Sequence, residues 1–327
     1  MSHANVPVES RYSETDLPSL SKLWAKKYIS KLKEQDSRLG DLSAAQLRID
    51  MARALMDLLR PVSAQAWHKT EALLAHEIRR HNIDSDLIDP WAISRDVHQI
   101  YEKSLSAFAN HVTPQQLSVA IAEDIGVLRR KHTAIDPRVI GFVSLQFHYC
   151  GQMLAAEVMG PAQAILKAYF KVVDDHLYMP LQRAYQAAAN YQPSDPRLAT
   201  VHHLLPYTSK IAIKIVEEVH RCYPDYRTFS GPINTPAIKV SSIRDVEMFQ
   251  IYILTCVLEQ NISAIQQELF PLCVMLYPTL KVRWELVREM LTLLQDYFAK
   301  YSDVQDAVYY RPYQDALWRM FSTEVLG

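Results

Sequence analysis

The chain has 327 residues with a formal net charge of −1, and 49% of the residues are hydrophobic. This composition is typical of a folded protein, and the near-zero charge excludes a strong non-specific nucleic-acid binder, which needs a surplus of basic residues. The 7 glycines spell neither a glycine-rich phosphate-binding motif nor the G-x-S-x-G motif of serine hydrolases.

Signals for membrane insertion or secretion are also missing from the sequence. No apolar run reaches the ~18 residues of a membrane span, and the N-terminal residues are polar without an apolar signal core. The four cysteines are far apart, and each lies in an apolar helical pattern, which favours buried, reduced thiols. They are Cys150, Cys222, Cys256 and Cys273. We therefore expect a cytoplasmic protein.

Apolar residues three and four positions apart recur along the chain, and this spacing predicts an all-α fold. Proline directly after Thr113 and after Asp136 marks two helix starts, because these residues suit the N-cap and proline suits the first helical position. The predicted helices of the first half span 17–35, 43–59, 62–81, 91–111, 114–131, 137–157 and 161–191, the last with a bend at Pro180.

A loop rich in proline and aspartate, 192–196, is the best boundary between domains. We predict one domain over 1–192 and a second over 196–327. The helices of the second domain are predicted at 196–222, 241–259, 262–277, 279–300 and 304–322, with an irregular stretch at 223–240 that is long for a helix–helix connection.

The two halves follow a similar order of motifs. Each has a helix that begins near an Arg-Asp pair, at Arg95-Asp96 and at Arg244-Asp245, followed by a short break and a long helix. This order favours an internal repeat, although any helical bundle offers such coincidences.

The second half resembles the phycobilisome protein family over roughly 196–300. The resemblance is carried by Tyr223-Pro224, by Gly231, by the segment Ser242-Ile243-Arg244-Asp245 and by Tyr252. It implies a globin-like helical fold and a cyanobacterial setting.

In that family a C-x-R-D segment carries a linear tetrapyrrole, the bilin. The resemblance implies that Arg244 pairs with a propionate and that Asp245 accepts hydrogen bonds from pyrrole N–H groups. The cysteine position is Ser242, whose hydroxyl cannot replace a thiolate in forming the thioether, so we expect no covalent bilin. Non-covalent binding through Arg244 and Asp245 stays open, beside the alternative that Ser242 and Asp245 cap a helix while Arg244 forms a salt bridge.

The first half resembles the globin domains of globin-coupled sensors. The matching stretch runs from Leu128 to Pro137 and continues into a long helix with Phe142, Phe147 and Tyr149. The resemblance implies that His132 ligates haem iron as the metal-binding residue and that Arg129 lies near the propionates. The alternative is a histidine among cations on a solvated helix end.

Other chemistry is weakly indicated. The neighbours His202 and His203 would point about 100° apart on a helix, so they cannot hold one metal together. No cysteine or serine is placed beside a base as a nucleophile needs. We predict a protein that is not an enzyme.

Two functions remain. The first is a regulatory or sensor protein of two globin-like domains that holds a tetrapyrrole, with haem favoured over bilin. The second is an adaptor or structural protein without a cofactor. On the question of the cofactor taken by itself, we expect that none is bound. Apolar residues spread around the helices at 137–157 and 161–191, and this predicts a homodimer through these two hairpins; a further protein partner is also expected.

Overall fold

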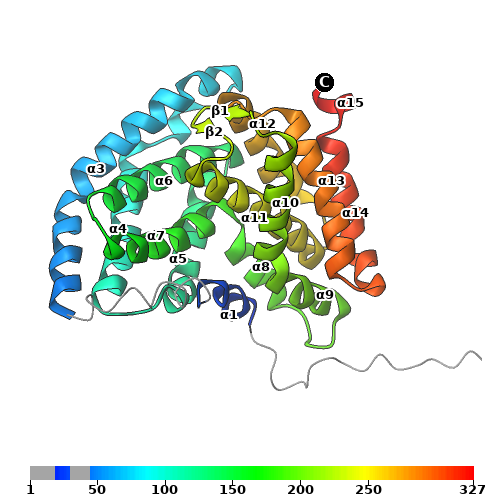
Figure 1. Cartoon of the computed structure of the whole chain (residues 1–327), viewed down its shortest axis with the longest axis horizontal. Helices are drawn as coiled ribbons and strands as arrows, with labels where there is room; N and C mark the ends of the chain where they lie inside the picture. The colour runs from blue at the N-terminus through cyan, green and yellow to red at the C-terminus, as the bar shows by residue number, and fades with distance from the viewer. Residues whose placement is uncertain (1–18, 30–44) are drawn as a thin grey trace, which may run out of the picture.

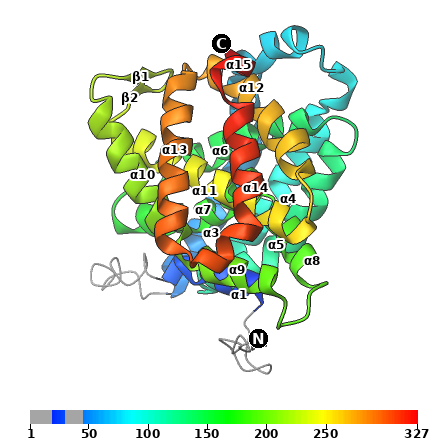
Figure 2. The same ribbon diagram turned by 90° about the vertical axis from the view of Figure 1, so that its right-hand side faces the viewer.

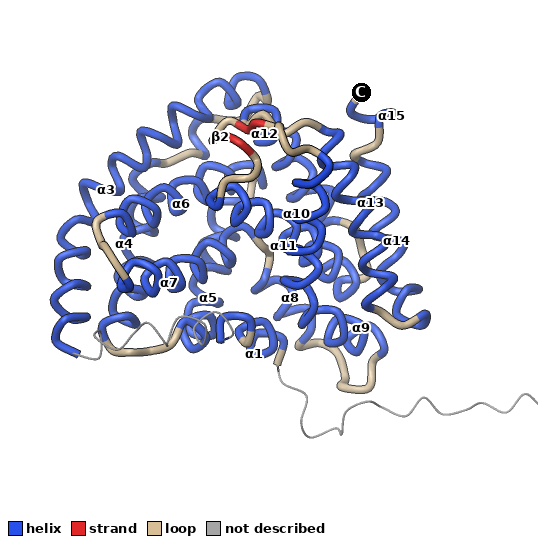
Figure 3. Tube along the Cα trace, viewed as in Figure 1, coloured by secondary structure: helices blue, strands red, loops and turns tan. Residues whose placement is uncertain are grey.

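The computed structural model describes residues 19–29 and 45–327. Most of these residues are helical, so the predicted all-α class is confirmed (Figure 3). The helices before the loop at 192–196 are α1 (Leu20–Ala25), α3 (Ala45–Arg80), α4 (Pro90–Ala109), α5 (Pro114–Thr133), α6 (Ile140–Ala156), α7 (Pro161–Tyr178) and α8 (Leu181–Ala188), with the 3₁₀ turns η1 (Ser85–Leu87) and η2 (Pro137–Val139).

The remaining elements follow that loop. They are α9 (Pro196–Leu204), the 3₁₀ turn η3 (Leu205–Tyr207), α10 (Thr208–Cys222), α11 (Pro236–Glu259), the π-helix η4 (Ala264–Leu269), α12 (Phe270–Thr279), α13 (Trp284–Tyr301), α14 (Val304–Met320) and α15 (Thr323–Leu326). A small antiparallel pair, β1 (Arg227–Thr228) with β2 (Gly231–Pro232), lies in the stretch predicted to be irregular. Among the described helices, none is both long and apolar enough to cross a membrane.

Helix starts follow the local chemistry that the sequence indicated. Thr113 caps α5 by a capping box with Gln116, and Pro114 follows at the first helical position. Asp136 caps η2, which continues into α6.

Some predicted helix boundaries were wrong. A single helix, α3, runs through Pro61, because packing on α6 and α4 holds it together across the missing N–H. The predicted helix 196–222 is divided by η3 at Pro206. In the predicted helix 17–35, α1 ends at Ala25 and residues 27–29 are again helical, whereas residues 30–35 lie outside the described residues.

The helices are arranged around one continuous hydrophobic core. Figure 1 shows α3 along the outer edge beside α4 and α6, with α10 and α11 near the centre. The antiparallel pair α13 and α14 covers the opposite side, as Figure 2 shows. Helix α8 packs against α11 across the loop at 192–196, and the division at that loop stays a prediction.

The apolar surface used to predict a homodimer is covered within the chain. Phe142, Phe147 and Leu166 are fully buried, since α3, α4 and α5 pack against α6 and α7. The premise that α6 and α7 expose a large apolar surface was therefore wrong, and the homodimer stays a prediction without that support.

A cluster of buried charges joins α7, α11 and the residues 27–28 that follow α1. The carboxylates of Asp175 and Glu247 are 0% and 1% exposed. The Lys27 ammonium lies 3.2 Å from Asp175 and 2.9 Å from Glu247, and Lys171 lies 2.7 Å from Asp175. The Tyr28 hydroxyl donates a 2.8 Å hydrogen bond to Asp175. Burial alone would raise the pKa of Asp175, but Lys171 and Lys27 outweigh it and hold this pKa well below its ordinary value.

Replacing Lys27 by Met is expected to lower the free energy of unfolding by about 3–5 kcal/mol, because two buried carboxylates, Asp175 and Glu247, then face one ammonium, that of Lys171. The matched control is Lys26→Met, an exposed neighbour that should change stability by less than about 0.5 kcal/mol. Urea unfolding followed by circular dichroism measures both. Equal small effects of the two variants would contradict a structural role for Lys27.

The buried imidazole of His176 makes stability depend on pH. Burial lowers the pKa of His176 from 6.5 to about 4, and its Nδ1 lies 2.8 Å from the Val172 carbonyl oxygen. The unfolded chain therefore binds more protons than the folded chain between these pH values. The stability gained from the neutral imidazole is present above pH 6.5 and is lost as the pH falls towards 4.

We expect the free energy of unfolding to fall by up to about 3 kcal/mol between pH 6.5 and pH 4 from His176 alone. Below pH 4 the depressed pKa of Asp175 adds a second loss. In the variant His176→Gln the slope above pH 4 should flatten, whatever its absolute stability. Urea titrations at several pH values test this, and an unchanged slope would contradict it.

Candidate functional site

An apolar pocket lies where α10, α11 and α13 meet. It has a volume of about 90 Å³ and is closed on one side by the loop that carries β1 and β2. Its apolar walls include Val216, Val246 and Leu286. The polar residues at its wall are Thr228, His220, Ser242, Asp245 and Tyr277.

Two of the residues singled out by sequence, Ser242 and Asp245, share this pocket because they lie one turn apart on α11. Burial raises the pKa of Asp245, and the nearby Arg244 partly opposes the shift. His220 faces them from α10, and its buried Nε2 has no hydrogen-bond partner among the described residues. Burial lowers the pKa of His220, and Lys239 lowers it further. The pocket thus combines apolar walls with a few polar groups, the usual make-up of a ligand site.

The Arg244 side chain lies outside this pocket and contacts the first half of the chain. Its guanidinium carbon lies 3.7 Å from the centre of the Tyr178 ring, at the end of α7. Its Nη1 lies 3.9 Å from Asp174, which also accepts a 2.8 Å contact from His148 on α6. Arg244 therefore holds α11 against α6 and α7 by a cation–π contact and a buried ion pair.

The residues do not fit a bilin. Ser242 offers no thiolate, and Arg244 is engaged by Tyr178 and Asp174. The cavity of about 90 Å³ is also far below the ~300–1,000 Å³ of usual ligand pockets. The role expected for Arg244 towards a propionate stays a prediction, and the geometry favours the salt-bridge alternative.

His132, the expected haem ligand, lies near the end of α5 with its side chain buried. Its Nε2 lies 2.6 Å from Asp96 on α4, and Lys131 contacts the same carboxylate at 2.8 Å. Burial raises the pKa of Asp96, but hydrogen bonds from His132 and Lys131 outweigh it, and the pKa is lowered overall. The nitrogen that would face an iron is thus held by a carboxylate, so the residues do not fit haem in this geometry. The assignment of His132 stays a prediction.

Arg129 is buried one turn earlier on α5. It donates to the Leu177 carbonyl oxygen, to the Tyr252 hydroxyl at 3.2 Å and to Glu268 at 3.1 Å. Arg129 therefore joins the first half to α11 and η4. Of the four expected site residues, Arg244 and Asp245 lie together, with Arg244 Nη2 3.6 Å from the Asp245 carboxylate. Asp245 also lines the apolar pocket, and Arg244 also contacts α7. His132 and Arg129 contact different partners.

Sequence reasoning missed the partners of these residues. His148 pairs with Asp174 between the consecutive helices α6 and α7, and His220 reaches the pocket wall from α10. No spacing rule could have found these contacts. The signal present was the Arg-Asp pair on α11, whose two side chains lie 3.6 Å apart.

Three cysteines are buried as expected, but Cys222 is exposed at the end of α10, where the apolar stripe ends. Burial raises the pKa of Cys150 and of Cys256 to about 12. Those two thiols stay protonated at neutral pH and are poor nucleophiles.

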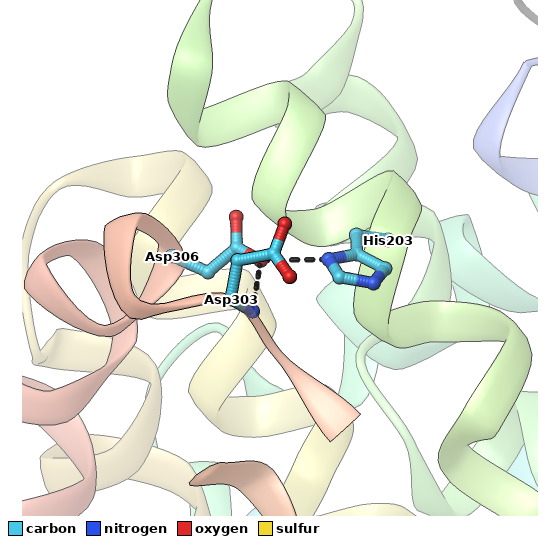
Figure 4. A group of neighbouring side chains, drawn as sticks. All are labelled: His203, Asp303 and Asp306. Carbon is cyan, nitrogen blue, oxygen red and sulfur yellow. Dashed lines mark hydrogen bonds and ion pairs between the residues drawn. The ribbon is translucent and has the colours of Figure 1, made fainter. Parts of the chain in front are cut away.

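His203 meets Asp303 and Asp306 where α9 packs on the start of α14 (Figure 4). His203 Nδ1 lies 2.7 Å from Asp306, which also accepts from Thr200 at 2.9 Å and from the Asp303 N–H at 3.0 Å. Asp303 in turn caps α14 in a capping box. The group has the composition of a cation site, but its carboxylates are already used to start the helix, and we assign no metal to it.

Replacing Arg244 by Met should lower the free energy of unfolding by about 2–4 kcal/mol, because the partly buried Asp174 loses a cation and Tyr178 loses its cation–π partner. Arg221→Met, at an exposed position, is the matched control. Chemical denaturation decides between them. A change no greater than that of the control would show that Arg244 does not hold the helices together.

The comparisons with known proteins agree with the sequence resemblance of the second half. No curated protein and no solved structure matches the chain. No match tests the resemblance of the first half to sensor globins, which stays a prediction. The family model described as Phycobilisome protein matches residues 168–320, from α7 to the end of α14, so this part of the chain is phycobilisome-like.

Proposed function

We propose that the protein is a non-enzymatic adaptor that uses its phycobilisome-like half for protein–protein contact and carries no bilin. The observation that carries the proposal is the position of Arg244. The guanidinium expected to bind a propionate is instead packed on Tyr178 and paired with Asp174. Arg244, which the resemblance assigns to a ligand site, thus contributes to the junction between helices.

The pocket supports the same proposal. Ser242 cannot form a thioether, and the cavity of about 90 Å³ would have to open widely to admit a tetrapyrrole. The space is filled instead by apolar side chains of α10, α11 and α13. These apolar side chains contribute to the stability of the protein as other core residues do.

An exposed apolar strip on α14 offers a surface for a partner. Val304 and Val308 are 93% and 67% exposed, and their spacing of four places them on one face of the helix. Trp318, further along α14, is also exposed. Adjacent exposed apolar side chains of this kind are typical of contact surfaces between proteins.

The alternative is a sensor that holds a tetrapyrrole without a covalent bond. It is supported by His220, whose Nε2 has no hydrogen-bond partner in the described part of the chain, and by Asp245, whose pKa is raised by burial, at the wall of one apolar pocket. Such groups often mark binding sites. The two functions differ in what they predict for added pigment.

The test is to titrate the purified wild type and Ser242→Cys with a linear tetrapyrrole and with haem, following visible absorption. We expect no saturable spectral change in the wild type, and no coloured band after denaturation of Ser242→Cys, because the pocket is filled. A saturable change abolished by Asp245→Asn, or by His132→Ala for haem, would overturn the adaptor proposal in favour of the sensor.

The contact surface is tested in parallel with a tagged chain in extract of the source cells. Val304→Asp/Val308→Asp should lose co-purifying protein that the wild type retains, whereas Ile135→Asp, at another exposed apolar residue, should retain it. If both variants retain the same protein, α14 is not the contact surface.

A further inference from the structure

Another cavity, separate from the apolar pocket and with charged and amide side chains in its wall, lies between α5, α8 and the π-helix η4. Its volume is about 320 Å³, at the lower end of the range of small-molecule sites. Most of its lining is basic or amide-bearing. The polar lining residues are Arg129, Arg130, Thr133, Gln182, Arg183, Gln186 and Glu268.

Positive charge exceeds negative charge around this cavity. Arg129 and Arg183 share a single carboxylate in the lining, that of Glu268. Arg183 also binds Glu259, which lies outside the lining. With Arg130 added, three guanidinium groups face two carboxylates. A positive excess in a partly buried place attracts an anion more strongly than the same charge on an open surface.

The third guanidinium group, that of Arg130, binds no acceptor within the described part of the chain. The Arg130 side chain folds back along α5 towards Gly126: a Cβ built at Gly126 would lie 3.5 Å from Arg130 Nη1. The same Cβ would overlap the side chain of Gln182. Glycine at 126 thus lets α8 approach α5 and lets Arg130 and Gln182 converge on the cavity.

The backbone opposite them is unusual. Glu268 lies on η4, a six-residue π-helix, a form that is rare and found often at functional sites. It brings Glu268 within reach of both Arg129 and Arg183, which come from two other helices.

We propose that this cavity binds a small oxygen-rich anion, a phosphate ester or a polycarboxylate. Planar guanidinium groups pair with both kinds of oxyanion through two parallel hydrogen bonds. The amides of Gln182 and Gln186 add neutral donors at the wall. Glu268 competes with such an anion for the same guanidinium groups. An anion that binds Arg129 or Arg183 replaces part of the ion pairing that Glu268 provides. Because Arg129 lies on α5 and Glu268 on η4, the anion would change how these elements are held together.

Isothermal titration of the full chain with inorganic phosphate, and separately with citrate, in a low-salt buffer free of both ions tests the proposal. We expect saturable binding that weakens with added salt. Arg130→Gln should weaken it about fivefold, as the loss of one exposed charged contact implies. Glu268→Gln should tighten it, because the competing carboxylate is gone. Phosphate binding alone would point to a phosphate ester, and citrate binding alone to a polycarboxylate.

The control is Arg60→Gln, at an exposed position on α3. It removes the same charge and should leave the affinity unchanged. The proposal is overturned if neither ion gives a saturable isotherm up to tens of millimolar, or if Arg60→Gln weakens binding as much as Arg130→Gln. Arg130 is exposed, so its variant should fold normally; circular dichroism confirms this for both variants and for Glu268→Gln.

Discussion

The arrangement of the helices depends on two carboxylates that lie almost entirely out of water. Asp175 on α7 and Glu247 on α11 belong to different halves of the chain, and both are held by Lys27 and Lys171. Removing two charges from water costs several kcal/mol for each ion unless their partners are well placed. The short segment after α1 that carries Lys27 therefore has a fixed position, and α7 and α11 cannot move apart without leaving a charge unpaired.

Arg244 and Arg129 extend this junction on either side. Arg244 reaches from α11 to Tyr178 on α7, and Arg129 reaches from α5 to Tyr252 and Glu268. The resemblances placed both residues near a tetrapyrrole, Arg244 in the phycobilisome family and Arg129 in the sensor globins. In this chain both guanidinium groups form contacts between helices.

Local chemistry allowed much of the fold to be predicted. Thr113-Pro114 gave the start of α5, and the apolar spacing gave the helical class. What failed depended on contacts between distant residues. Pro61 does not end α3, because tertiary packing outweighs its local effect. The contact of Arg244 with Tyr178 also depends on the fold, since Tyr178 lies 66 residues away in sequence. The expected site residues could be named from motifs, but their partners Asp96, Glu268 and Asp174 could not.

The buried charges also bear on how the chain folds as it is synthesised from its N-terminus. Lys27, Lys171 and Asp175 precede Glu247 in the sequence, so a nascent chain that ends near the loop at 192–196 holds both lysines and only one of the two carboxylates. The charges of this cluster are balanced only once the segment that carries Glu247 has been added.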